Sequence, residues 1–126
     1  MSGDFTLDTN VIIDHLKGLE PAGRHLARLS GARLLASVIT RFELMSFDGL
    51  SLDEELRIEE FLRHVTIIPF SDDVEQAAIR LRRREHLKLP DAAIAATALV
   101  TDSTLITNDH RLLRLKGSEL KIIAPS

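Results

Sequence analysis

Apolar positions along the chain follow two alternating patterns. Short, nearly continuous apolar runs are typical of buried strands, and apolar residues three and four positions apart are typical of helices. The first pattern predicts strands at residues 5–7, 33–37, 66–70, 104–107 and 121–123. The second predicts helices at residues 11–17, 21–31, 38–47, 52–62, 72–88, 90–99 and 110–117, the last ending near Gly117. This alternation predicts an α/β three-layer sandwich around a mainly parallel, four- to five-stranded sheet.

Small polar residues mark the predicted starts of several helices. Ser37, Ser51 and Ser71 each precede a helical segment, where a serine oxygen accepts hydrogen bonds from the unpaired N–H groups of the first turn. Ser51 and Glu54 have the spacing of a capping box. Pro90 favours the start of a new helix, so we expect the preceding helix to end at Leu89-Pro90.

The apolar residues inside the helices predict the face that each helix buries. After Ser37, the predicted buried side chains are Val38, Ile39, Phe42, Met45 and Phe47. After Ser51, they are Leu56, Phe61 and Leu62. After Ser71, they are Val74, Ala77, Ala78 and Leu81. The alanines of residues 90–99 predict close approach to a neighbouring layer, which we expect to be the sheet.

Length and composition predict one globular domain over residues 1–126. Hydrophobic residues make up 44% of the chain and charged residues 28%, which is ordinary for a folded domain. Cysteine is absent, and neither a charged-then-apolar leader nor an apolar run near 18 residues occurs, so we expect a cytoplasmic protein without a membrane span. The net charge of −3 and the absence of Trp and Tyr argue against a basic or base-stacking nucleic-acid binder.

A carboxylate stands where the first strand gives way to the first helix. Asp8 follows the apolar strand, and Thr9 and Asn10 occupy the junction, where short polar side chains can cap a helix. The carboxyl ends of parallel strands are also where open sheets bind ligands. A buried anion there costs free energy unless a cation compensates it. Asp8 is therefore either part of a cation site or only a helix cap.

Three further acids occur at comparable positions. Asp109 follows the fourth strand, Asp91 opens the alanine-rich helix, and Glu43 lies in the helix after the second strand. If the first and fourth strands are neighbours, all four acids converge at one edge of the sheet. Carboxylates that close repel one another unless a divalent ion binds, and oxygen ligands without Cys favour Mg²⁺ or Mn²⁺ over Zn²⁺. Taken singly, each acid is equally compatible with capping or a solvated surface.

Basic residues directly precede Asp91. They are Arg80, Arg82, Arg83, Arg84 and Lys88. Such a cluster beside an acidic site would hold the backbone of a phosphodiester substrate, since contacts to phosphates position a nucleic acid without reading its bases. A solvated basic helix face explains the same pattern equally well.

Four segments, in this order, resemble the PIN-domain family, specifically the VapC-type toxins of toxin–antitoxin pairs. They are residues 7–14 (LDTNVIID), 37–44 (SVITRFEL), 89–98 (LPDAAIAATA) and 105–109 (LITND). Each segment alone is a weak signal, but the ordered set is specific and the likeness covers essentially the whole chain.

The resemblance implies a metal-dependent endoribonuclease. Asp8, Asp91 and Asp109 would hold Mg²⁺ (or Mn²⁺), and Glu43 would orient a bound water or a second ion. Metal-activated water would attack the phosphodiester, leaving a 5′-phosphate and a 3′-hydroxyl. Supporting groups near the metal would be Thr9, Asn10 and Thr107.

The resemblance also implies partners. A cognate antitoxin protein would lay its C-terminal segment in a groove near the early helices and place a basic residue in the acidic site. The apolar and acidic residues around positions 50–60 would suit such a basic partner. The family usually forms homodimers.

One departure keeps other functions open. The family often has a further acid and an aromatic residue after the fourth acid, whereas His110, Arg111 and Leu112 follow Asp109 here. This favours weak binding of any second metal ion without substrate; we expect His110 to be solvated rather than a general base. The alternatives are a non-toxin PIN nuclease for RNA processing and a catalytically inactive PIN-like module that binds RNA or protein. A phosphoacceptor domain ranks last, because the fourth strand lacks the lysine it would require.

Overall fold

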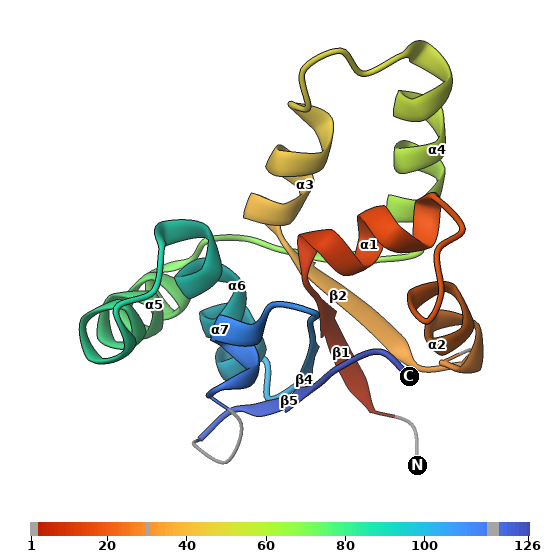
Figure 1. Cartoon of the computed structure of the whole chain (residues 1–126). Coiled ribbons are helices and arrows are strands. Elements are labelled where there is room, and N and C mark those ends of the chain that lie inside the picture. Colours follow the sequence, from red (N-terminus) through yellow and green to blue (C-terminus); the bar gives the residue numbers. More distant parts are fainter. Residues whose placement is uncertain (1–2, 30, 116–118) are drawn as a thin grey trace.

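A fully parallel sheet of five strands forms the centre of the molecule (Figure 1). The computed structural model describes residues 3–29, 31–115 and 119–126. The strands are β1 (Asp4–Leu7), β2 (Arg33–Ser37), β3 (Thr66–Ile68), β4 (Thr104–Ile106) and β5 (Lys121–Ile123). Their spatial order is β3-β2-β1-β4-β5, with parallel pairing throughout. The predicted fold class is confirmed, and the first and fourth strands are neighbours.

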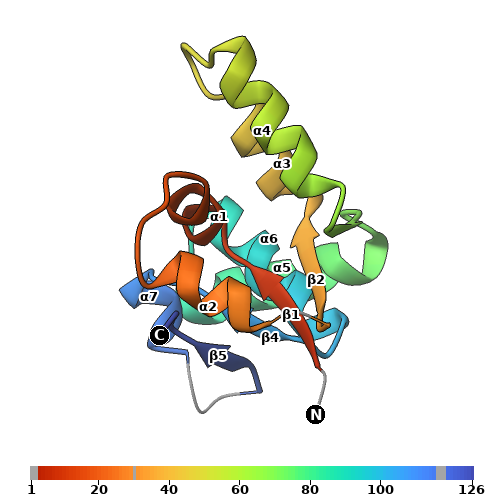
Figure 2. The same ribbon diagram turned by 90° about the vertical axis from the view of Figure 1, so that its right-hand side faces the viewer.

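Helices cover both faces of the sheet. They are α1 (Thr9–Leu16), α2 (Ala22–Arg28), α3 (Val38–Met45), α4 (Leu52–Leu62), α5 (Asp72–Glu85), α6 (Leu89–Val100) and α7 (His110–Leu113). Helices α1 and α2 lie on one face, and α5, α6 and α7 lie on the other (Figures 1 and 2). Helices α3 and α4 form a pair that projects away from the body of the domain (Figure 2). Within the described residues, no helix has both the length and the apolar character needed to cross a membrane.

Successive residues of the strands pack into two separate hydrophobic cores, one on each face of the sheet. Leu105 of β4 packs with α5, α6 and α7, whereas its neighbour Ile106 packs with α1, α2, α3 and α4. Successive strand side chains point to opposite faces, so a strand covered on both sides is apolar at every position. Helix α6 packs against α5 as well as against β1, β2 and β4. Its alanines allow this double contact and bring its first turn, with Asp91, to the carboxyl edge of the sheet.

The predicted capping residues are confirmed, but some helix ends differ. Ser37, Ser51 and Ser71 cap α3, α4 and α5, and Ser51 and Glu54 form the capping box. Helix α1 begins at Thr9 instead of residue 11, because Asp8 is its N-cap. Helix α2 ends at Arg28, short of residue 31, and β3 ends at Ile68, short of residue 70.

Helix α5 stops earlier than predicted. It ends at Glu85 because His86 adopts the left-handed conformation at a φ of 57°, which breaks the helix before Leu89 and Pro90. Helix α7 ends at Leu113, and the predicted end at Gly117 lies outside the described residues.

The predicted buried faces of α3 and α4 are partly wrong. Phe42, Phe47 and Leu56 are exposed by 69%, 62% and 53%, respectively. The buried residues of α3 are Thr40 and Leu44, and the buried residue of α4 is Ile58. The predicted buried residues of α5 are confirmed. The difference arises because the α3–α4 pair projects away from the body of the domain, so its apolar side chains outnumber the positions that the body can cover (Figure 2).

Removing a core side chain of β4 tests this packing. Leu105 is fully buried, so Leu105→Ala should lower the free energy of unfolding by about 2–5 kcal/mol. Leu52→Ala is the matched control, because Leu52 is 70% exposed and its loss should change stability by less than about 0.5 kcal/mol. Urea denaturation of the two variants measures both values; equal losses would contradict the described core.

Candidate metal centre

All four predicted acids line one open pocket at the carboxyl edge of the sheet. The pocket has a volume of about 410 Å³, and its lining includes Asp8, Glu43, Asp91 and Asp109; we call it the acidic pocket. Strands β1 and β4 pair side by side, and the backbone N–H of Asp8 donates to the carbonyl of Ile106 at 3.0 Å. The two strand ends, the first turn of α6 and a side chain of α3 thus meet in one place.

Asp8 is the most deeply buried of the four acids, with 4% of its surface exposed. Its Oδ1 accepts a hydrogen bond from the backbone N–H of Thr9 at 2.8 Å, and its Oδ2 accepts one from the Thr107 hydroxyl at 2.6 Å. Burial raises the pKa of Asp8 to about 6, although these two hydrogen bonds oppose the shift. Asp8 is therefore both the cap of α1 and a lining residue of the acidic pocket.

Threonine hydroxyl groups also position the second acid. Thr9 Oγ1 donates to Glu43 Oε1 at 2.8 Å and lies 3.0 Å from the hydroxyl oxygen of buried Thr40. This chain of hydroxyl groups links the start of α1 to the middle of α3. Asn10 is exposed and lines the same pocket.

Asp91 and Asp109 occupy different electrostatic settings. Burial raises the pKa of Asp91, and the negative charge of Asp109 raises it further. Asp109 caps α7, and the Arg111 side chain beside it lowers its pKa, mainly by hydrogen bonding. Arg111 Nη2 lies 3.1 Å from Asp109 Oδ2 and 3.8 Å from Asp91 Oδ2. A guanidinium thus compensates two of the four carboxylates.

Three residues of this region were not singled out from the sequence. Asp48 adds a fifth carboxylate to the pocket lining, but Asp48-Gly49 resembles an ordinary turn sequence. In the sequence, Thr40 is a single polar residue within a predicted helix. Its contact with Thr9 depends on how α1 and α3 pack, which the sequence does not show. Arg111 was noted only as the residue that replaces a family acid.

The predicted basic residues lie outside the lining of the acidic pocket. Arg80, Arg83 and Lys88 are exposed, and the charge of Lys88 contributes to lowering the pKa of Asp91 against the larger effects that raise it. Arg84 pairs with Glu85 and Glu119, at 2.9 Å in each case. His110 is exposed at the start of α7, as expected.

The donor chemistry of the pocket fits a hard divalent cation. Carboxylates from four separate segments share one pocket, and burial and mutual repulsion raise the pKa of Asp8 and Asp91. Within the described part of the chain, however, no three acidic or histidine side chains stand close enough to form a ready metal-binding group. A bound ion would have to draw these carboxylates together.

The buried Asp8 carboxylate predicts a pH-dependent stability. Because its pKa is raised from 3.8 to about 6, the folded state binds more protons than the unfolded state between these values, and stability falls as the pH rises through this window. Asp8→Asn removes the titrating carboxylate and with it this fall in stability. In EDTA at pH 7.5, the variant should be more stable than the wild type by about 1–3 kcal/mol, and the gain should shrink towards pH 4.

Urea denaturation across this pH range measures the difference between the two proteins. The control is Asp102→Asn, because the Asp102 side chain is 90% exposed. A gain for Asp8→Asn that does not change with pH would contradict the assignment.

Comparison with known proteins agrees with this architecture. The sequence is 35% identical over 112 residues to Ribonuclease VapC19 of Mycobacterium tuberculosis, covering 83% of this chain and 88% of that protein. The structure resembles a toxin–antitoxin complex from Klebsiella pneumoniae, with a TM-score of 0.79, 30% identity, and coverage of 96% of this chain and 97% of that chain. It shares its fold with VapBC2 from Rickettsia felis bound to a promoter DNA fragment, with a TM-score of 0.82, 21% identity, and coverage of 96% and 98%.

The sequence also matches the PIN domain over residues 5–118. This match spans most of the chain and confirms the resemblance drawn from the four sequence segments. The chain belongs to the PIN-domain family.

Proposed function

We propose that the protein is an endoribonuclease that depends on Mg²⁺ or Mn²⁺ and acts in the cytoplasm as the toxin of a toxin–antitoxin pair. The observation that carries the proposal is the acidic pocket, where four carboxylates from four segments meet and burial raises the pKa of one of them, Asp8, to about 6. The 35% identity to a protein named as a ribonuclease supports the same conclusion.

The four acids divide into two roles in this proposal. Asp8, Asp91 and Asp109 would hold the ion, which supplies an activated water and neutralises charge at the phosphate. Thr107 keeps Asp8 oriented through its 2.6 Å hydrogen bond to Asp8 Oδ2. Glu43, fixed by Thr9, would orient the attacking water by accepting one of its protons in a hydrogen bond. Asn10, exposed in the pocket lining, would donate to a phosphate oxygen.

The RNA backbone needs a positive surface next to this acidic pocket. We assign this role to Arg80, Arg83 and Lys88, whose side chains are exposed on α5 and just before Asp91. Arg84 is a weaker candidate than the sequence indicates, because Glu85 and Glu119 already engage its guanidinium. Contacts of this kind hold phosphates and depend strongly on salt concentration.

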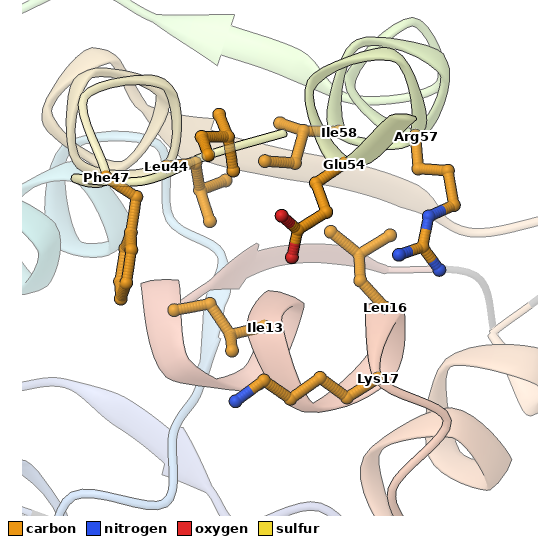
Figure 3. Close-up of a pocket in the computed structure, with 9 residues that line it drawn as sticks. Ile13, Leu16, Lys17, Leu44, Phe47, Glu54, Arg57 and Ile58 are labelled. Atoms are coloured by element: carbon orange, nitrogen blue, oxygen red, sulfur yellow. The ribbon is translucent and has the colours of Figure 1, made fainter. Parts of the chain in front are cut away.

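An apolar groove next to the acidic pocket suits the antitoxin. The groove has a volume of about 480 Å³ and lies between α1, α3 and α4 (Figure 3). Leu16, Leu44 and Ile58 form its apolar floor and walls, and the Glu54 carboxylate projects into it (Figure 3). We propose that an amphipathic segment of the antitoxin occupies this groove. The similarity of this chain to a toxin–antitoxin complex from Klebsiella pneumoniae supports an antitoxin as the partner.

Two residues connect the groove to the acidic pocket. Ile13 and Phe47 line both cavities. A segment in the groove would therefore lead directly to the carboxylates, where one basic side chain would neutralise them and block the ion.

We also propose a homodimer. The dimer would cover apolar surface on α5 and α6, where Ile79, Leu89 and Val100 are exposed by 38%, 57% and 41%, respectively.

Cleavage of total RNA by the purified protein tests the proposed reaction. We expect cleavage with Mg²⁺ or Mn²⁺, none with EDTA, and a loss of at least about 100-fold for Asp91→Asn, because the variant removes a metal ligand. Asp102→Asn is the matched control, since Asp102 lies before β4 at the opposite edge of the sheet and is 90% exposed at its side chain. Cleavage that persists in EDTA would contradict the metal-dependent reaction. A folded protein that binds metal and antitoxin but cuts no RNA would favour the binding module instead.

Two phenylalanines on and beside α3 test the groove. Phe47→Ser should weaken binding of the antitoxin encoded beside this gene by about tenfold or more, because the bound segment would lose an aromatic side chain that lines the groove. Phe42→Ser is the control, because Phe42 is 69% exposed and lies outside the lining of both cavities. Titration calorimetry measures the two affinities. Equal affinities for the two variants would place the antitoxin elsewhere.

A further inference from the structure

A positively charged side chain of this chain already sits on the acidic pocket. Arg111 Nη2 pairs with Asp109 Oδ2 at 3.1 Å and with Asp91 Oδ2 at 3.8 Å. Arg111 Nε and the Arg111 backbone N–H both donate to Asp109 Oδ1, at 3.3 and 2.8 Å. Both carboxylate oxygens of Asp109 are thus engaged by one residue, and the same guanidinium reaches Asp91.

This contact involves the oxygens that a metal ion would need. A divalent ion binds carboxylate oxygens, and a guanidinium in two-point contact occupies lone pairs of the same two oxygens. The two cations would also repel each other at so short a distance. The contact agrees with the finding that, within the described residues, no three acidic side chains form a ready metal-binding group.

We infer that Arg111 is a displaceable internal cation of the acidic pocket, which neutralises Asp91 and Asp109 in the ion-free protein and must leave them when a divalent ion binds. The inference rests on the proposed function, since it concerns the same carboxylates. Arg111 and a divalent ion would then compete for the same carboxylates. This competition would raise the ion concentration at which the pocket fills.

The local structure allows Arg111 to move. Its side chain is 50% exposed, whereas those of Asp91 and Asp109 are each 16% exposed. Rotation of the guanidinium into solvent opens no core, because Leu112, which is fully buried, anchors α7 independently. The groups that hold Asp8 are different: a backbone N–H and a neutral hydroxyl orient its carboxylate and add no positive charge. Competition is therefore confined to the Asp91 and Asp109 side of the pocket.

Direct titration with Mn²⁺ tests the competition. By calorimetry, Arg111→Ala should bind Mn²⁺ about threefold to tenfold more tightly than the wild type, the range expected when a partly exposed ion pair no longer has to be broken. Arg111→Lys keeps the charge without the two-point contact, so its affinity should fall between the two. Arg114→Ala, at the end of the same helix, controls for the general loss of positive charge and should match the wild type.

The movement itself has a separate readout. The side-chain Nε–H signal of Arg111 in an NMR spectrum should lose its protection against exchange with water as Mg²⁺ is added, since its hydrogen bond to Asp109 is broken. Arg84 provides an internal control, because its Nε donates to Glu85 at 2.9 Å at a site without the four acids. The Arg84 signal should stay unchanged through the titration.

The outcomes separate this inference from the proposed function. Equal Mn²⁺ affinities for the wild type and Arg111→Ala, or an Arg111 signal that Mg²⁺ leaves unchanged at saturation, would overturn the inference and leave the metal centre standing. Failure of both proteins to bind Mn²⁺ at the acidic pocket would overturn the metal centre and the inference together.

Discussion

The burial of the Asp8 carboxylate is the constraint on which the acidic pocket depends. Asp8 directly follows the central strand of the sheet, and burial raises its pKa to about 6 despite two hydrogen bonds. A carboxylate in that position destabilises the fold at neutral pH unless a positive charge compensates it. The negative charges of Asp91 and Asp109 disfavour the charged form of Asp8 further. The buried position of Asp8 has a physical explanation if the carboxylate lowers the stability of the ion-free domain and thereby allows the domain to bind a cation strongly.

The structure places the acidic pocket and the apolar groove side by side. The α3–α4 pair projects from the body and forms the groove with α1, and Ile13 and Phe47 form the boundary between groove and acidic pocket. One bound segment would thereby gain hydrophobic contacts and reach the carboxylates. Arg111 provides a positive charge at the same carboxylates from within the chain. Metal ion, partner and Arg111 would in this account compete for one set of oxygens.

Much of the site could be predicted because it depends on chain order and strand periodicity. Asp8 and Asp109 follow apolar runs, and parallel pairing brings such strand ends to one edge. The outward faces of α3 and α4 could not be predicted, because Phe42 and Phe47 have the spacing of core residues and only the tertiary arrangement leaves them exposed. Arg111 is a similar case: its sequence position shows that an acid is missing, but the direction of its side chain depends on the packing of α7.

A crystal structure of the protein soaked with Mn²⁺, with the ion located by its anomalous scattering, tests the metal centre most directly. We expect one ion in the acidic pocket, coordinated by Asp8, Asp91 and Asp109, and the Arg111 guanidinium turned away from both of its present partners. An acidic pocket without an ion at saturating Mn²⁺ would contradict the central claim that these carboxylates form a metal centre.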